Sequence, residues 1–316
     1  MAIEIGPGWV IGGGISIITP PPAPTVATAG WVSGGNPAVR STVNRITFAT
    51  DTATASIRGP LSTGTGSAAG TGNTTDGWVG GNVNGPASTV NRITYATDTS
   101  TASVRGPLSA ARFYLAAAGN TTDGWFGGGV PSPGTVGSTV DRITFATDTA
   151  TASVRGPLSI STARFSAAGI STDGWFGGGR VPGSPPSIST VQRITYATDT
   201  ATASVRGPLS IEIFATASSS DNTTYGWWAG GSSNVSTVQR ITYATDTATA
   251  SIRGPLSSSR GYFTAVGDNS YGWFAGGFSS TSVVDRITYA TDTATASVRG
   301  PLSAAVYSSA GTSGVQ

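Results

Sequence analysis

The 316-residue chain contains no cysteine, no histidine and, because all 17 of its basic residues are arginine, no lysine. The absence of cysteine excludes disulfides and thiolate chemistry. The absence of histidine removes the commonest general base and metal ligand, and the absence of lysine removes Schiff-base chemistry. Serine, threonine, tyrosine, aspartate, two glutamates and arginine remain. These residues predict a chain that is not an enzyme and that needs no cofactor.

Long apolar runs are also absent. No stretch approaches the roughly 18 apolar residues of a membrane span, so we expect no membrane insertion. The first residues, MAIEIGPGWVIGGG, lack the basic segment and long apolar core of a signal peptide. We therefore expect no signal peptide and synthesis in the cytoplasm.

Charge is sparse, with 10% charged residues and a net charge of +2. A nucleic-acid-binding protein usually concentrates its basic residues on one surface. Here most arginines recur at two fixed positions, typified by Arg45 and Arg58, with an aspartate between them in every copy. This regularity predicts structural arginine pairs and no nucleic-acid partner.

Six near-copies of one segment dominate what is present. The segment RITFATDTATASIRGPLS spans Arg45–Ser62 and returns at spacings of 47, 50, 51, 47 and 46 residues. The later copies begin at Arg92, Arg142, Arg193, Arg240 and Arg286. A fixed period of this length indicates stacked units, each of which buries its apolar face only against its neighbours.

Each unit carries the signals of four short strands. In the third copy we expect them at Phe113–Ala118, Gly124–Phe126, Thr139–Ala146 and Ala150–Arg155. Apolar and polar residues alternate in the third of these, and a Gly-Pro pair ends the fourth. Six units of four antiparallel strands predict an all-β fold, a six-bladed β-propeller.

The units also resemble a known family. A glycine pair, a variable loop and two strands separated by a short polar turn resemble the kelch repeat, over residues 25–316. The resemblance implies a kelch-like propeller, although Ile57, Val104 and Val154 stand where kelch repeats carry an aromatic residue in the fourth strand.

A more specific resemblance lies in the amino-acid sequence of the repeat. DRITYATDTATASVRGPLS together with GWFGGG is similar to kelch-like repeats in structural proteins of tailed phages, including cyanophages. This resemblance implies a virion component that is made in the host cytoplasm and is present in many symmetric copies.

The two ends of the repeat array suggest how the ring closes. After the last copy, Ser303–Gly314 reads as a first strand with no second strand after it. We expect residues 304–311 to supply the inner strand of blade one, since pairing both ends in one blade removes exposed edges. The alternative is that Thr25–Ala29 fills that place.

Residues 1–24 differ from the repeats and form a predicted N-terminal arm. The segment ends in a proline cluster, which favours an extended, stiff chain. It is either a frayed tail, a strand packed on the ring, or an anchor that binds a partner subunit. The anchor hypothesis rests on apolar side chains, namely Ile3, Ile5, Trp9 and Ile11.

The acidic residues offer little for catalysis or metal binding. The six aspartates typified by Asp51 occupy one repeat position, and we expect them to bond the backbone of their own turns. A glycosidase needs two acids facing one bond, and the acids outside the turns are Asp141, Asp285, Glu4 and Glu212. No turn has an EF-hand-like spacing, so we predict no metal site and no catalytic residue.

Six tryptophans recur at one position of the second strand, preceded by glycine. Stacking on sugars is one interpretation, but burial between adjacent blades explains the regular spacing better. Trp228 follows Trp227 and departs from this register, so it is the candidate for an exposed tryptophan.

The copies differ most in the loops between the second and third strands and in the connections between blades. These loops are expected to emerge on one face, whereas the other face carries nearly constant turns. Either exposed loops simply tolerate change, or the varied face is a recognition surface. The candidate binding residues on it are Asn36, Arg40, Asn82, Asn84, Arg180, Phe214, Trp228, Asn234 and Phe278.

Together these observations favour a non-enzymatic structural or adhesive component of a phage particle. A rigid propeller would display variable loops to other virion proteins or to a glycan or protein of the host surface. The alternative hypothesis is a carbohydrate-binding propeller, and a glycan-cleaving enzyme is a third.

Overall fold

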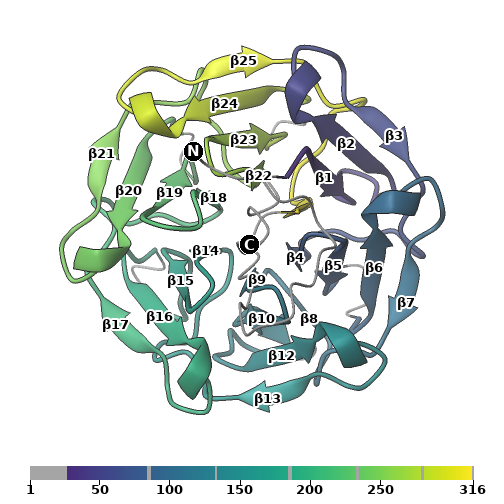
Figure 1. Cartoon of the computed structure of the whole chain (residues 1–316). Helices are drawn as coiled ribbons and strands as arrows, with labels where there is room; N and C mark the ends of the chain where they lie inside the picture. The colour runs from purple at the N-terminus through teal and green to yellow at the C-terminus, as the bar shows by residue number, and fades with distance from the viewer. Residues whose placement is uncertain are drawn as a thin grey trace, which may run out of the picture.

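The computed structural model describes residues 27–83, 87–131, 134–183, 187–232, 235–278 and 281–314. Six four-stranded antiparallel sheets surround a central axis, which makes the molecule a six-bladed β-propeller (Figure 1). The all-β, six-bladed architecture predicted from the repeat is confirmed. No helix in these ranges is long and apolar enough to cross a membrane.

The strands of each blade follow one another from the axis outward (Figure 1). Blade 1 contains β26 (Ala310–Ser313), β1 (Ala29–Ser33), β2 (Val43–Thr47) and β3 (Ser56–Arg58). Blade 2 contains β4 (Ala69–Gly72), β5 (Asp76–Gly80), β6 (Val90–Thr94) and β7 (Ser103–Arg105). Blade 3 contains β9 (Ala116–Gly119), β10 (Asp123–Gly127), β12 (Val140–Thr144) and β13 (Ser153–Arg155).

The remaining three blades repeat the pattern. Blade 4 contains β14 (Ser166–Gly169), β15 (Asp173–Gly177), β16 (Val191–Thr195) and β17 (Ser204–Arg206). Blade 5 contains β18 (Ala217–Ser220), β19 (Tyr225–Ala229), β20 (Val238–Thr242) and β21 (Ser251–Arg253). Blade 6 contains β22 (Thr264–Gly267), β23 (Tyr271–Ala275), β24 (Val284–Thr288) and β25 (Ser297–Arg299).

A short 3₁₀ turn follows the third strand of every blade. These turns are η1 (Phe48–Thr50), η2 (Tyr95–Thr97), η3 (Phe145–Thr147), η4 (Tyr196–Thr198), η5 (Tyr243–Thr245) and η6 (Tyr289–Thr291). The third strand is therefore shorter than predicted, since β12 ends at Thr144 and the chain turns at Phe145.

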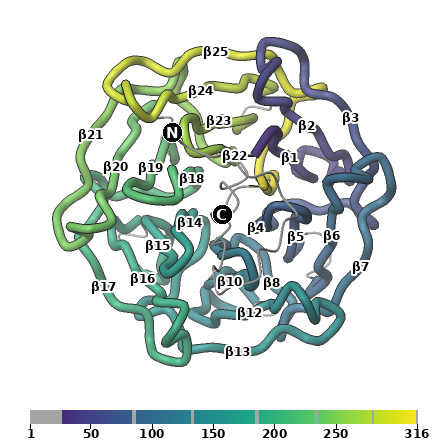
Figure 2. Tube along the Cα trace, in the orientation of Figure 1, coloured from purple at the N-terminus to yellow at the C-terminus, as the bar shows by residue number. Residues whose placement is uncertain are grey.

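Ring closure follows from the pairing of the two ends of the described chain. Strand β26 pairs antiparallel with β1, with Val32 opposite Gly311, and the C-terminal segment lies beside the start of the ring (Figure 2). The inner strand of blade 1 begins at Ala310, later than the expected 304, and Ala29 belongs to the second strand of the blade. The predicted arm, residues 1–24, lies outside the described residues.

Each blade is buried on both faces because it packs between two others. Val140 on one face of β12 and Asp141 on the other are both fully buried, and Ile143 is 2% exposed. Innermost strands contain mainly Gly, Ala, Ser and Thr, because six of them converge on the axis. At Gly70 in β4, for example, an added Cβ would lie 2.4 Å from the carbonyl oxygen of Gly311.

The recurring tryptophans fill the spaces between blades. All six are at most 5% exposed. Trp125 stacks on Tyr196 of the next blade, with ring centroids 3.8 Å apart and planes 6° from parallel. An aromatic residue of the 3₁₀ turn plays this part at every interface. The predicted burial of these tryptophans between blades is confirmed, and it removes them as sugar-stacking residues.

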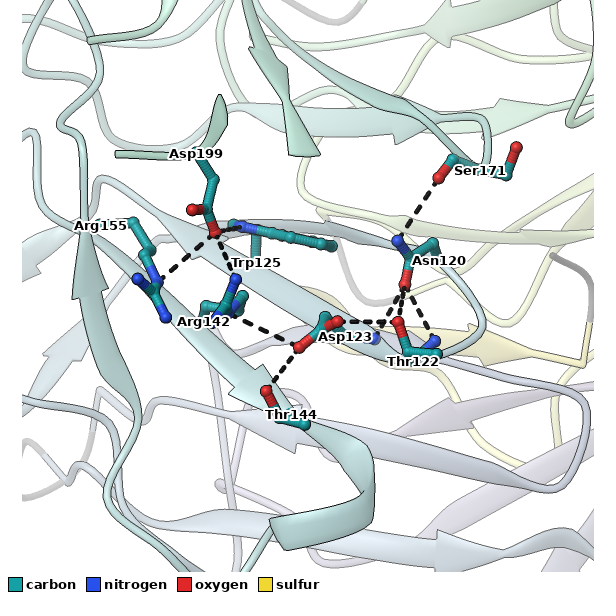
Figure 3. Close-up of polar contacts among 9 residues, drawn as sticks. All are labelled: Asn120, Thr122, Asp123, Trp125, Arg142, Thr144, Arg155, Ser171 and Asp199. Atoms are coloured by element: carbon teal, nitrogen blue, oxygen red, sulfur yellow. Dashed lines mark hydrogen bonds and ion pairs between the residues drawn. The ribbon is translucent and has the colours of Figure 1, made fainter. Parts of the chain in front are cut away.

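One aspartate joins each pair of neighbouring blades (Figure 3). Asp199 Oδ2 accepts a hydrogen bond from Trp125 Nε1 at 2.9 Å and another from Arg142 Nη1 at 3.1 Å. Arg155 Nε completes the group 3.5 Å from the same oxygen. The same arrangement recurs around the ring, through Asp98, Asp148, Asp246, Asp292 and Asp51.

These contacts confirm the predicted structural arginine pairs and correct the role given to the aspartates. The carboxylate of Asp199 reaches across to the tryptophan and arginines of the preceding blade (Figure 3). It was expected to bond the backbone of its own turn. The deciding physical factor is that a 5–7% exposed carboxylate at this position is stabilised most by the two guanidinium groups that face it.

Candidate binding site at the mouth of the channel

The loops that vary between copies interlock on one face of the ring. Strand β11 (Val130–Pro131), in a loop between second and third strands, pairs with β8 (Arg112–Phe113), in a connection between blades. Single bridges join further loops of the two kinds, namely Arg40 with Thr65, Arg180 with Ala163 and Asn36 with Tyr307. The two sets of varied loops therefore share one face, as the repeat predicted.

Six backbone hydrogen bonds close a ring around the axis on this face. The residue two positions before each inner strand lies in the left-handed region, with φ between 53° and 60°. Its N–H donates to the carbonyl oxygen of the equivalent residue in the preceding blade, at 2.6–2.9 Å. The six residues are Ser67, Tyr114, Arg164, Ala215, Tyr262 and Ser308. We call them the axial ring.

A left-handed conformation costs a non-glycine residue about 1 kcal/mol or more. Here each such residue makes a hydrogen bond to two neighbours, and the bond from Ser67 to Ser308 closes the circle. The closed ring offsets the cost and fixes the backbone under the side chains. Those side chains are thus held in one place at the mouth of the central channel, whose walls are built from the axial ring and the innermost strands.

A hollow of about 490 Å³ lies beside the axial ring. Its walls contain five aromatic side chains, those of Tyr114, Phe214, Tyr262, Phe278 and Tyr307. Successive ring centroids lie 6.3 Å apart for Phe214 and Tyr262, 6.0 Å for Tyr262 and Phe278, and 5.7 Å for Phe278 and Tyr307. Phe278 is 54% exposed, so part of this aromatic surface faces solvent.

Arg164 stands next to the hollow with its guanidinium between two tyrosines. Its Cζ lies 4.2 Å from the centre of the Tyr114 ring, and its Nη1 donates a hydrogen bond to Tyr262 Oη at 2.8 Å. Arg180 lies over Phe214 at 5.9 Å. Within the described part of the chain, neither arginine has a carboxylate within ion-pair range.

Four of the predicted binding residues belong to this surface. Phe214 and Phe278 come from different blades and line the hollow together. The guanidinium of Arg180 lies over the ring of Phe214. Asn36 forms a backbone bridge with Tyr307, another residue of the wall. Arg40 lies on the same face but outside the hollow, where its backbone pairs with Thr65.

Two of the predicted binding residues are buried, which is a correction. Trp228 is fully buried, and its Nε1 donates to the carbonyl oxygen of Ser166 at 3.3 Å. Asn82 is 6% exposed and holds a connection between blades, accepting from the Gly66 N–H and donating to the Gly64 carbonyl. Neither side chain is exposed on the varied face. Asn84, Asn234 and the arm residues Ile3, Ile5, Trp9 and Ile11 lie outside the described residues.

Sequence reasoning missed Tyr114, Arg164, Tyr262 and Tyr307. A signal existed, because the residue two positions before each inner strand changes between copies within a nearly constant register. It was hidden by the expectation that Phe113–Ala118 is one strand. The chain breaks at Tyr114, whose φ of 58° cannot continue a strand, and β9 begins at Ala116.

The acids of the described chain are placed elsewhere. Asp141 and Asp285 are fully buried and accept hydrogen bonds from Arg112 and Arg260 at 2.6 and 2.8 Å. Burial raises the pKa of Asp268, although hydrogen bonds from Ser270 and Tyr271 partly oppose this. Among the described residues that line the hollow there is no carboxylate. Its side chains can stack and donate hydrogen bonds, and Arg164 and Arg180 beside it can attract an anion.

No protein-family model matches the chain, and no curated protein matches it either. The fold defines a six-bladed β-propeller, and the residues at the channel mouth define its candidate site.

Proposed function

We propose that the chain is a non-catalytic recognition propeller, a structural or adhesive module of a phage particle. The varied face, with the aromatic hollow at its centre, is the surface that meets the partner. The partner is another virion protein or a molecule of the host surface.

One observation carries this proposal, namely how the residues outside the repeat are distributed. Twelve of the 17 arginines occupy the two repeat positions and join neighbouring blades. Of the other five, Arg112 and Arg260 neutralise buried aspartates. The remaining three, Arg40, Arg164 and Arg180, lie on the varied face, together with the aromatic residues of the hollow. Three arginines that have no carboxylate partner among the described residues thus lie on one face, beside aromatic side chains, which favours binding there.

The phage setting rests on the resemblance of the repeated segment to kelch-like repeats in structural proteins of tailed phages. A closed ring suits such a setting, since it leaves no blade with an unpaired inner strand. The rigid backbone of the axial ring would keep the binding groups ordered before contact, which lowers the entropic cost of binding.

A second candidate function is carbohydrate binding. The observation that favours it is the set of aromatic rings in one open hollow, with Phe278 half exposed. Aromatic surfaces combined with a few polar groups are typical of small-ligand sites. In this version the propeller attaches the particle to a host glycan, so the two proposals share one surface.

Antibody-labelled electron microscopy of purified phage particles tests the setting. We expect label at a defined position on the tail, neck or capsid of particles from the phage that encodes the chain. Intact particles that carry no label, under conditions where a known virion protein is labelled, would contradict a virion role.

A further inference from the structure

We infer that the hollow binds an acidic sugar, one ring of a carboxylate-bearing glycan, with the carboxylate on Arg164 and the sugar ring against Tyr262 and Phe278. This inference rests on the proposed recognition function and names the class of ligand.

The charge of the ligand follows from Arg164. A guanidinium carries five N–H donors in a planar fork and is always protonated. In the described structure one of these donors is bound to Tyr262 Oη, and one face of the group rests on Tyr114. Arg164 is partly exposed and has no carboxylate partner among the described residues. The remaining donors suit a carboxylate, which accepts from such a fork in pairs.

The ring of the ligand follows from the aromatic wall. Tyr262 lies between Arg164 and Phe278, so a group bound to the guanidinium meets aromatic surface next to it. The C–H face of a pyranose is apolar and slightly positive, and it packs on the negative face of an aromatic ring. Ser232 and Ser308 in the same hollow offer hydroxyls to the sugar edge. A hollow of about 490 Å³ lies within the usual range of small-ligand sites.

The backbone of the hollow argues against an extended peptide as the ligand. A peptide that adds a strand needs unpaired N–H and C=O groups along an edge. Here the N–H groups of Ser232, Phe278 and Tyr307 already donate to carbonyl oxygens of neighbouring loops, at 2.7, 2.7 and 3.2 Å. Those of Tyr262 and Ser308 belong to the axial ring. The hollow therefore offers side chains and carries few backbone groups for pairing.

The surrounding charge agrees with an acidic ligand. Arg40 and Arg180 lie on the same face and have no ion-pair partner in the described ranges. Glu212 is the exposed acid that lies nearest in sequence to a residue of the hollow, two positions before Phe214. An excess of arginine attracts anions to the face before they dock.

The test is a glycan array in which each uronate-bearing oligosaccharide is printed beside its methyl ester, a neutral copy of the same sugars. The full chain should bind uronate members and lose about tenfold or more on the esters, as expected for charge-assisted hydrogen bonds. The variant R164Q should lose a similar factor on the acids alone. Phe278→Ala should weaken binding to acids and esters alike.

The matched control is Arg40→Gln, which removes the same charge from the same face but away from Tyr114 and Tyr262, the two tyrosines that flank Arg164. It should change affinity by less than about threefold, because a rim charge acts mainly on the association rate. Melting temperatures of all variants should match the parent chain. Equal binding to acids and esters, unchanged binding by R164Q, binding only to acidic peptides printed on the same array, or no binding at all would each overturn the inference.

The array result is separable from the fate of the proposed function. Suppose that the antibody labels phage particles and that Ser232→Arg abolishes attachment to host cells. The proposed recognition by this face is then supported even when the array shows no preference for acids. If the particles carry no label, the phage setting fails whatever the array shows.

Discussion

At the scale of single residues, two fully buried aspartates show how charge is matched to a partner. Asp141 in blade 3 and Asp285 in blade 6 occupy one strand position, and each faces an arginine in the preceding connection. In the other four blades the same position carries Asn or Gln, and the arginine is replaced by Thr65, Thr162, Ile213 or Val306. In blade 4 the two positions form a neutral contact, since Gln192 Nε2 donates to Thr162 Oγ1 at 3.3 Å.

This substitution pattern gives a direct prediction. Arg112→Thr leaves the fully buried Asp141 without its cation, which should lower the free energy of unfolding by about 3–5 kcal/mol. The double variant Arg112→Thr/Asp141→Gln recreates the hydrogen-bonded neutral pair of blade 4, Thr162 and Gln192, and should recover most of the loss. Urea denaturation measures both. A double variant as unstable as the single one would show that charge pairing is not what couples these positions.

Buried tyrosines make the blade interfaces sensitive to alkali. Burial raises the pKa of Tyr196, because the phenolate would lose its hydration. The folded-state pKa lies above the unfolded value of about 10, so this stabilising contribution is complete below pH ~10 and is lost as the pH rises further. Tyr95, Tyr243 and Tyr289 behave in the same way.

Phenylalanine occupies the same position in two other blades, at Phe48 and Phe145, so Tyr196→Phe should fit without strain. We expect its melting temperature to fall less between pH 9 and pH 11 than that of the parent chain. The reverse change, Phe145→Tyr, should make the fall steeper. Thermal melts across this pH range decide the point, and parallel curves for all three proteins would contradict it.

At the scale of structural elements, the connection between blades depends on close backbone contact. The Gly156 N–H donates to the Asp199 carbonyl at 2.8 Å, and an added Cβ would lie 2.0 Å from the carbonyl oxygen of Ala201. Gly156→Ala should therefore destabilise the chain by about 2 kcal/mol or more, as overpacking does. The control is Gly137→Ala, where a Cβ would meet nothing closer than 3.7 Å. Equal stability of the two variants in urea would contradict this account.

The outer strands of the blades are held by ion pairs, while their apolar side chains face solvent. Ile57, Val104 and Val154 stand at the expected aromatic position and are 59–64% exposed. The flanking residue of the same strand, Arg155 in blade 3, instead pairs with Asp199 of the next blade (Figure 3). Arginine and aspartate thus hold the outer edge of the blade, and no large apolar side chain is required there.

At the scale of the whole molecule, stability depends on closing the ring. Strand β26 is the inner strand of blade 1, and its four residues pair with β1. Deleting residues 309–316 should leave β1 with an open edge and lower the melting temperature by about 10 °C or more, since about 1 kcal/mol shifts a chain of this size by a few degrees. An unchanged melting temperature would show that closure through β26 contributes nothing.

The repeat predicted the fold well because each copy contains the same strand pattern and the same turn residues. It predicted the burial of Trp125 and the structural role that Arg142 and Arg155 share, because both depend on spacing alone. It could also have placed Trp228, because the equivalent residues of other copies, such as Phe126 and Phe176, are apolar and buried. It could not place Asn82, whose amide holds a connection between two blades. Tyr262 and Arg164 meet at the axis across two blades, and no local pattern reports such a contact.

The most direct test of the central claim introduces the same bulky cation on each face. Ser232→Arg fills the hollow of the varied face, and Thr121→Arg changes an exposed turn on the uniform face. Attachment of the purified chain to host cells is measured for both, with melting temperatures as a check on folding. The account predicts that Ser232→Arg abolishes attachment and that Thr121→Arg leaves it intact. Attachment that survives Ser232→Arg, or that is lost only with Thr121→Arg, would contradict it.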